Sequence, residues 1–146
     1  MKKYRKAVFI VTYAKEKNKI YYLILKRKLH WKGWEFPKGG VNFLEPKKNA
    51  VIREIKEETG LDVLELKKFK ISGKYKYDKK YSDRPKIIGQ KFSLYAVEVK
   101  KENVKIDRLE HSSYKWLEFE KAVKELTWPN QRKCLKIVNK EIKNEI

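Results

Sequence analysis

Three glutamates in the segment REIKEETG, residues 53–60, are spaced so that they can act together. Glu54, Glu57 and Glu58 stand at positions i, i+3 and i+4, which share one face of a helix, and like charges there repel by roughly 0.2–0.5 kcal/mol per exposed pair. A hard divalent cation would cancel this repulsion, because Mg²⁺ prefers oxygen ligands and is commonly completed by substrate phosphates. It would also lower the pKa of a bound water that can attack phosphorus. The competing interpretation is a solvated helix face paired with Lys56 and other lysines, and the three glutamates alone favour it.

The chain as a whole is strongly basic, with 38 Lys and Arg against 19 Asp and Glu and a net charge of +19. Attraction to polyphosphate or nucleic acid is one interpretation of this charge. Because the positive charge is nearly all lysine and is spread along the chain, a lysine-biased genome explains it at least as well. The charge therefore indicates affinity for anions and nothing more specific.

Length and composition predict one globular domain over residues 1–146, since 41% of the residues are hydrophobic and 13% are aromatic. No run of about 18 apolar residues is present, so we expect no membrane span and no membrane partner. The basic and then apolar start lacks a small-residue cleavage site and is interpreted as a strand. The single cysteine, Cys134, excludes an internal disulfide and favours a cytoplasmic location.

The glutamates are predicted to lie on a helix that follows a long loop. Residues 27–46 contain three of the six glycines and two of the four prolines, which is typical of a functional loop. Pro46 suits the first turn of the helix and Gly60 the position just past its end. Strands are expected at 7–13, 20–26, 61–71, 86–99 and 113–117, and further helices at 119–126 and from Pro129 onward. Strands that do not alternate regularly with helices indicate an α+β fold or a mixed-sheet sandwich.

The surroundings of the glutamates form a longer pattern at fixed spacing. Gly39 is followed by Glu45 and then by Arg53, Glu54 and the rest of REIKEETGL. This matches all nine defined positions of the signature G-x5-E-x7-R-E-U-x-E-E-x-G-U, in which U is aliphatic. The chain therefore resembles a Nudix hydrolase, with residues 39–61 as the Nudix box.

The resemblance implies a Nudix-type α/β/α sandwich with a mixed central sheet and a loop-helix-loop catalytic motif. It also implies hydrolysis of a phosphoanhydride bond with Mg²⁺, or Mn²⁺ as a substitute, held by Glu54, Glu57 and Glu58 with help from the carbonyl of Gly39. Glu45 and Arg53 match the pair that ties the helix to its preceding loop, and Gly60 matches the motif's closing glycine. Many members have glycine where this chain has Leu44, so the shape of that loop is expected to differ.

Two further segments are similar to subfamilies of Nudix hydrolases. WEFPKGG, residues 34–40, is similar to a segment of diadenosine tetraphosphate hydrolases, and it places Lys38 beside the metal site as a charge for phosphate. Glu110 matches a late glutamate that joins the metal site or acts as base in those enzymes and in RNA 5′-pyrophosphohydrolases. IGQKF, residues 88–92, resembles both subfamilies. The alternative for Glu110 is an ordinary surface acid.

Substrate recognition is expected to use aromatic stacking, worth roughly 1–3 kcal/mol per base. Tyr77 is the preferred residue for holding the base, and the other candidates are Tyr75, Tyr81 and Trp31. Trp34, Trp116 and Trp128 are predicted to pack in the core, and His30 and His111 to be structural. Arg27 and Arg132 are candidates for tracking an RNA backbone, although solvated charge is the simpler interpretation of each.

We therefore expect a cytoplasmic Mg²⁺-dependent pyrophosphohydrolase that cleaves dinucleoside polyphosphates, with no obligate protein partner. The alternative is removal of pyrophosphate from triphosphorylated RNA 5′ ends. Sanitation of mononucleotides and hydrolysis of nucleotide sugars rank lower. A non-catalytic nucleotide- or RNA-binding domain ranks last, because all the box carboxylates are present.

Overall fold

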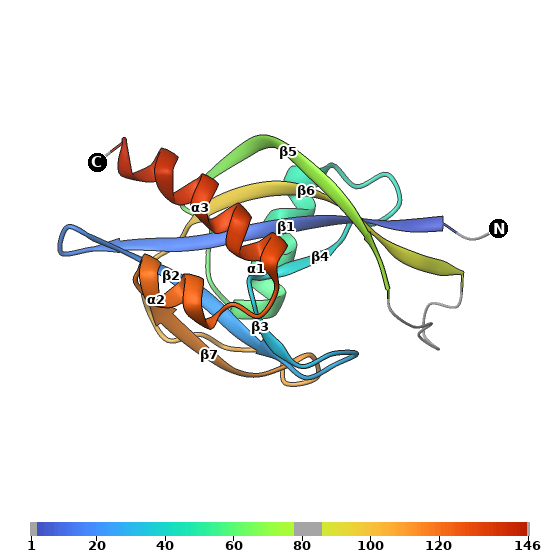
Figure 1. Ribbon diagram of the computed structural model, residues 1–146, viewed down its shortest axis with the longest axis horizontal. Coiled ribbons are helices and arrows are strands. Elements are labelled where there is room, and N and C mark those ends of the chain that lie inside the picture. The colour runs from blue at the N-terminus through green and yellow to red at the C-terminus, as the bar shows by residue number, and fades with distance from the viewer. Residues whose placement is uncertain (1–2, 78–85, 146) are drawn as a thin grey trace.

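A mixed β-sheet forms the centre of the protein, with helices on both of its faces (Figure 1). The computed structural model describes residues 3–77 and 86–145. In this part of the chain the elements are β1 (Lys3–Glu16), β2 (Lys19–Arg27), β3 (Gly33–Glu35), β4 (Lys38–Gly40), α1 (Lys47–Thr59), β5 (Glu65–Lys76), β6 (Ile87–Glu98), β7 (His111–Leu117), α2 (Phe119–Glu125) and α3 (Pro129–Lys143). The strand order is β3-β2-β1-β6-β5, with β4 also paired to β1 and β7 to β2. The predicted α+β fold is confirmed.

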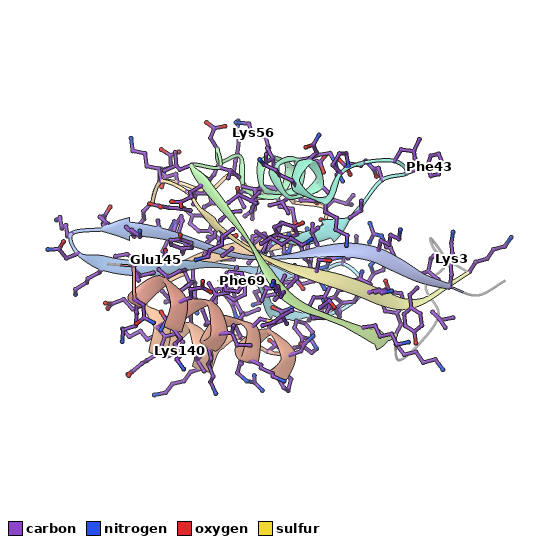
Figure 2. The ribbon with its side chains drawn as sticks, turned by 90° about the horizontal axis from the view of Figure 1, so that it is seen from above. Lys3, Phe43, Lys56, Phe69, Lys140 and Glu145 are labelled. Carbon is purple, nitrogen blue, oxygen red and sulfur yellow. The ribbon has the colours of Figure 1, made fainter. Side chains whose placement is uncertain are left out.

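The central strands are buried on both faces. Side chains of β1 alternate between two hydrophobic clusters: Phe9 packs with the residues of α3, and Val8 packs with those of α1. Figure 2 shows α1 and α3 on opposite sides of the sheet. Because both faces are covered, β1 and β2 have near-continuous apolar sequences and not the alternation of a half-exposed strand. In the described part of the chain, no helix has the length and apolar character needed to cross a membrane.

The strands β1 and β2 diverge away from their turn and form a fork, which holds the site-bearing segment 33–40. The two strands pair as an antiparallel hairpin only near their turn, at residues 13–16 and 19–22. Farther from the turn, β3 pairs with β2 and β4 pairs with β1, so residues 33–40 lie between the diverging strands. Glu35 is thereby attached to β2, and Lys38 is attached to β1. The fork explains how two residues that are close in sequence reach two different strands.

The helix α1 begins and ends where the sequence predicts. Pro46 is its N-cap residue in an extended conformation, and Gly60 ends it with φ of 74°. The Gly60 N–H donates to the carbonyl of Lys56 at 2.9 Å. Glycine is suited to this position because a left-handed backbone places no Cβ in conflict with the preceding turn.

Two predictions about strands need correction. The strand expected at 61–71 lies at Glu65–Lys76, so it begins later than predicted and continues into polar residues beyond position 71. The reason is the ladder with β6, which continues to the pair Lys76↔Gly89 and does not depend on side-chain hydrophobicity. The loop expected at 27–46 also contains the short strands β3 and β4, which the fork stabilises.

Candidate active site

The three box glutamates differ in exposure. Glu54 and Glu58 are buried, whereas the side chain of Glu57 is 56% exposed and lies 3.3 Å from Arg53 Nη1. The Lys38 N–H donates to Glu58 Oε2 at 3.3 Å, which brings the end of α1 against β4. A Cβ on Gly39 would lie 2.0 Å from Glu54 Cδ, so only glycine leaves space for this carboxylate. The close approach of β4 to α1 thus fixes the positions of the two buried carboxylates, Glu54 and Glu58.

Arg53 joins the helix to the preceding loop. Its Nε and Nη2 atoms donate to the two carboxylate oxygens of Glu45, each at 2.9 Å, and Nη2 also donates to the Gly40 carbonyl at 2.8 Å. Its Nη1 atom donates to Glu54 Oε1 at 2.7 Å and so orients that side chain. The bond from Arg53 lowers the pKa of Glu45 to about 2. Leu44 beside it has φ of 60°, a conformation that favours glycine.

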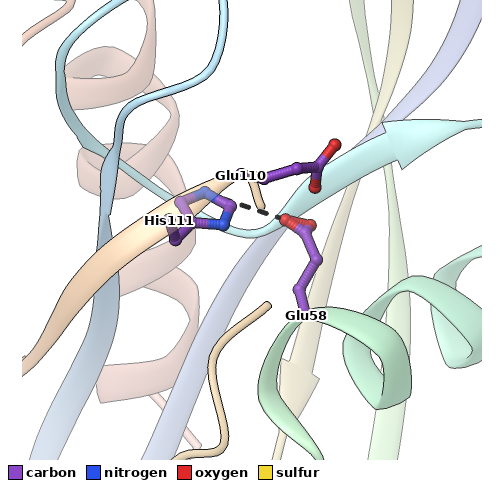
Figure 3. A group of neighbouring side chains, drawn as sticks. All are labelled: Glu58, Glu110 and His111. Carbon is purple, nitrogen blue, oxygen red and sulfur yellow. Dashed lines mark ion pairs between the residues drawn. The ribbon is translucent and has the colours of Figure 1, made fainter. Parts of the chain in front are cut away.

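Glu110, which directly precedes β7, and His111, the first residue of β7, both approach Glu58 (Figure 3). One possible ligand atom from each of the three residues lies within 4.8 Å of the others. His111 Nε2 is 4.0 Å from Glu58 Oε1 but only 3.0 Å from Glu35 Oε2, to which it donates. Because this nitrogen is engaged with Glu35, we assign the metal-binding capacity to the carboxylates and interpret His111 as a neighbour that supports them.

The electrostatics of this cluster favour a bound cation. Burial raises the pKa of Glu58 well above its usual value, and the charges of Glu54, Glu110 and Glu35 raise it further. Burial also raises the pKa of Glu54 to about 7, against the lowering effect of Arg53. Glu58 Oε1 is buried and has no hydrogen-bond partner among the described residues. A buried carboxylate oxygen without a hydrogen-bond donor in the described structure, among several carboxylates, fits a hard divalent metal ion, which supplies positive charge.

Glu35 is a third buried carboxylate, and the sequence patterns did not identify it as part of the site. It is completely buried on β3, where it accepts bonds from Trp31 Nε1 and His111 Nε2, each at 3.0 Å, and from Arg27 Nη1 at 3.3 Å. Burial alone would raise its pKa, but Lys38, His111, Arg27 and Trp31 together lower it to about 2. The available signal was a charged residue between Trp34 and Phe36 in the segment WEFPKGG, where the neighbours predict burial.

A cavity of about 850 Å³ lies between the sheet and α3, and its lining includes Trp31, Lys38, Tyr77 and Trp128. The rings of Trp31 and Tyr77 are 6.4 Å apart between centroids and inclined by 35°. A smaller recess shares Trp31 and Lys38 with this cavity and is also lined by Glu54. The aromatic space therefore adjoins the carboxylate cluster. Trp128, expected to be a packing residue, forms part of the wall.

The remaining predicted residues lie in varied positions. Arg27 is buried beside Glu35, and Arg132 Nη1 donates to the carbonyls of Leu126 and Thr127 at 2.6 and 3.1 Å. The backbone of Tyr75 pairs with Gln90 in the ladder of β5 and β6. Tyr81 lies outside the described residues. The role of these residues in binding an RNA backbone or a base stays a prediction.

The comparisons with known proteins agree with this geometry. The NUDIX domain family matches residues 3–136, and the chain belongs to this family, which confirms the resemblance found in residues 39–61. An RNA pyrophosphohydrolase of Nitratiruptor sp. is 31% identical, over 96% of this chain and 96% of that protein. An RNA pyrophosphohydrolase of Haemophilus influenzae is 31% identical over 59% of this chain, and the match spans only 50% of that relative. An Ap4A hydrolase of C. elegans, solved as a binary complex, has a TM-score of 0.72 and 26% identity, covering 96% of this chain and 98% of that one.

Proposed function

We propose that the protein is a Mg²⁺-dependent pyrophosphohydrolase that cleaves dinucleoside polyphosphates such as diadenosine tetraphosphate. The observation that carries this proposal is the continuity between the aromatic cavity and the buried carboxylates through Trp31 and Lys38. A nucleotide carries an aromatic base followed by a polyphosphate. The base would match the aromatic cavity, and the polyphosphate would match the adjoining carboxylates with their cation. The single cysteine continues to favour the cytoplasm as the place of action.

The cation would be held by Glu54, Glu58 and Glu110, with Glu57 and the Gly39 carbonyl as further oxygen donors. A bound Mg²⁺ or Mn²⁺ would polarise a phosphate oxygen and lower the pKa of a water molecule. Arg53 keeps Glu54 oriented through the bond between Nη1 and Oε1.

The residues around the phosphate have separate tasks. Lys38 presents its ammonium next to the recess as a point charge for the phosphate chain. The side chain of Glu110 is 30% exposed, so as the alternative to holding the cation its carboxylate would accept a proton from a water molecule.

The base would stack at the Trp31–Tyr77 pair on the wall of the cavity. Stacking contributes roughly 1–3 kcal/mol per base and tolerates different bases, because every base has a π face. This recognition would tolerate salt, since it depends on ring contacts and on phosphate held at a buried site. By contrast, attraction of any polyanion to a chain of charge +19 weakens steeply as salt is added.

Triphosphorylated RNA 5′ ends are the second candidate substrate. The observation in its favour is the name of the Nitratiruptor relative, which matches over 96% of both chains. The first nucleotide of such an RNA also carries a base followed by a polyphosphate, so the same cavity would serve it.

Product analysis on a panel of substrates tests the proposal. The panel contains diadenosine tetraphosphate, triphosphorylated RNA, nucleoside triphosphates and a nucleotide sugar, each with Mg²⁺ at physiological salt and with EDTA as control. We expect the dinucleotide to be hydrolysed fastest and EDTA to abolish turnover. Efficient hydrolysis of the RNA with poor hydrolysis of the dinucleotide would support the second candidate instead.

A further inference from the structure

The carboxylate of Glu35 makes different contacts through its two oxygens. Oε1 accepts the bond from Trp31 Nε1 at 3.0 Å and lies 3.6 Å from Lys38 Nζ. Oε2 accepts from Arg27 Nη1 at 3.3 Å and from His111 Nε2 at 3.0 Å. Oε1 thus contacts two of the residues that line the cavity, Trp31 and Lys38, and Oε2 contacts two buried residues that do not line it.

On the cavity side, these contacts fix the position of a ring and of a charge. The bond from the indole N–H restricts rotation of Trp31, whose ring centroid lies 4.3 Å from Lys38 Nζ and 4.7 Å from Arg27 Cζ. Lys38 therefore interacts with both the carboxylate and the ring. The base-binding wall and the phosphate-facing ammonium are held as one unit with Glu35 at its centre.

On the other side, each partner of Oε2 lies one contact away from the carboxylate cluster. Arg27 Nη2 is 3.9 Å from Glu110 Oε1, and His111 Nε2 is 4.0 Å from Glu58 Oε1. A displacement of the Glu35 carboxylate would therefore change the positions of both side chains that adjoin Glu110 and Glu58. If Glu35 served only as the counter-ion of Arg27, its contacts with Trp31, Lys38 and His111 would not be needed.

We propose that Glu35 is a positioning residue that holds the base- and phosphate-binding side chains in register with the carboxylate cluster. The identity of the ligand rests on the proposed function. The link through Glu35 between the cavity-lining side chains and the carboxylate cluster rests on the contacts described above. Glu35 lies outside the Nudix box, four positions before Gly39.

Glu35→Gln tests the proposal because it keeps the shape of the side chain, removes its charge and replaces one acceptor oxygen by a donor group. We expect kcat/KM to fall about 10–100-fold, the range seen when an outer-shell partner of a metal site is removed. The fall should be shared between a higher KM and a lower kcat. Binding of the nucleotide in EDTA, followed by tryptophan fluorescence, should weaken as well, which is a readout that needs no turnover.

Tyr22→Phe is the matched control for a loss of buried hydrogen bonding. The Tyr22 hydroxyl donates to Asn139 Oδ1 at 2.7 Å in the packing of β2 against α3, and both residues lie outside the lining of the cavity and the recess. This variant should lower the melting temperature and leave kcat, KM and nucleotide binding within about two-fold of the wild type. If Glu35→Gln also changes only the melting temperature, or changes kinetics no more than Tyr22→Phe, the positioning role is wrong.

Trp31→Phe provides a second test that does not depend on the folding of the Glu35 variant. It removes the indole N–H that bonds to Oε1 and keeps an aromatic ring. We expect a higher KM and weaker binding in EDTA, and wild-type values for both would overturn the proposal. The kinetics of the variants are compared on the substrate of the panel that the wild type hydrolyses fastest. If the dinucleotide is not a substrate, the wild type alone shows it, and the test of the positioning role is not affected.

Discussion

Glu35 and Glu58 are both completely buried and both approach His111, yet their electrostatic environments are opposite. Lys38, Arg27, His111 and Trp31 lower the pKa of Glu35 to about 2 in spite of its burial. Burial and neighbouring carboxylates raise the pKa of Glu58, whose Oε1 atom lacks a hydrogen-bond partner among the described residues. The protein itself supplies the positive charge beside Glu35, whereas the charged form of Glu58 would be stabilised by a cation from solution. The comparison separates the region that we propose positions the substrate from the region that we propose binds the metal.

The largest effect is expected for Glu58→Gln. Removing a carboxylate from the cation site should lower turnover roughly 100–1,000-fold, the scale observed when one electrostatic stabiliser of a transition state is lost. Steady-state turnover at saturating Mg²⁺ measures the loss. In EDTA the melting temperature should hold or rise, because the variant removes repulsion and not a favourable pair. Near-normal turnover would remove Glu58 from the metal site.

The metal-free protein should lose stability as the pH rises from 5 to 8. A raised folded-state pKa, such as about 7 for Glu54, means that the folded protein binds more protons than the unfolded chain between about pH 4.5 and 7. Ionisation of this carboxyl group in the folded protein then costs roughly 3 kcal/mol. Glu35 has a lowered pKa, so its contribution is present above about pH 4.5 and constant in this window.

Urea unfolding in EDTA at pH 5 and pH 8 measures this effect, with Glu58→Gln as the comparison. The variant should depend less on pH than the wild type, because one of the buried carboxyls has been removed. Equal pH dependence in the two proteins would show that ionisation of Glu58 does not oppose folding.

Tyr77→Ala tests whether the base-binding region acts independently of the metal-binding region. If the ring stacks on the base, the variant should lose roughly 1–3 kcal/mol of substrate binding, and Tyr77→Phe should lose little because stacking does not need the hydroxyl. The Mg²⁺ affinity should not change in either variant. KM and melting temperature measured on both proteins decide the matter: an unchanged KM with a lower melting temperature would make Tyr77 a structural residue.

The smallest effect is expected for Leu44→Gly, in the loop that precedes the helix. Relief of the left-handed conformation at Leu44 favours the folded state by about 1–2 kcal/mol, and the added freedom of glycine in the unfolded chain offsets about 0.5–1 kcal/mol. We expect a net gain of about 1 kcal/mol or less in chemical unfolding, with unchanged kinetics. A loss of stability would show that the loop does not strain Leu44.

The candidate metal-binding carboxylates of α1 could be predicted from the sequence because they are local and their spacing is periodic. Glu54, Glu57 and Glu58 lie within five positions, and the pattern from Gly39 to Leu61 is continuous. The surroundings of Glu35 could not be predicted, although three of its four partners lie within eight positions of it. No periodic spacing marks those contacts, and the fourth partner, His111, comes from β7, 76 positions away. The fork that assembles them depends on how β3 and β4 pair, and no local propensity specifies that pairing.

Proton release on Mg²⁺ binding tests the central difference between the two glutamates most directly. Calorimetric titration at pH 6, in two buffers with different ionisation enthalpies, counts the protons displaced when the ion binds. Burial raises the pKa of both Glu54 and Glu58 and so favours their protonation in the metal-free protein, and we therefore expect the wild type to release protons and Glu58→Gln to release fewer. Binding of Mg²⁺ without proton release, or equal release from both proteins, would contradict the assignment of Glu58 as the buried acid that awaits a cation.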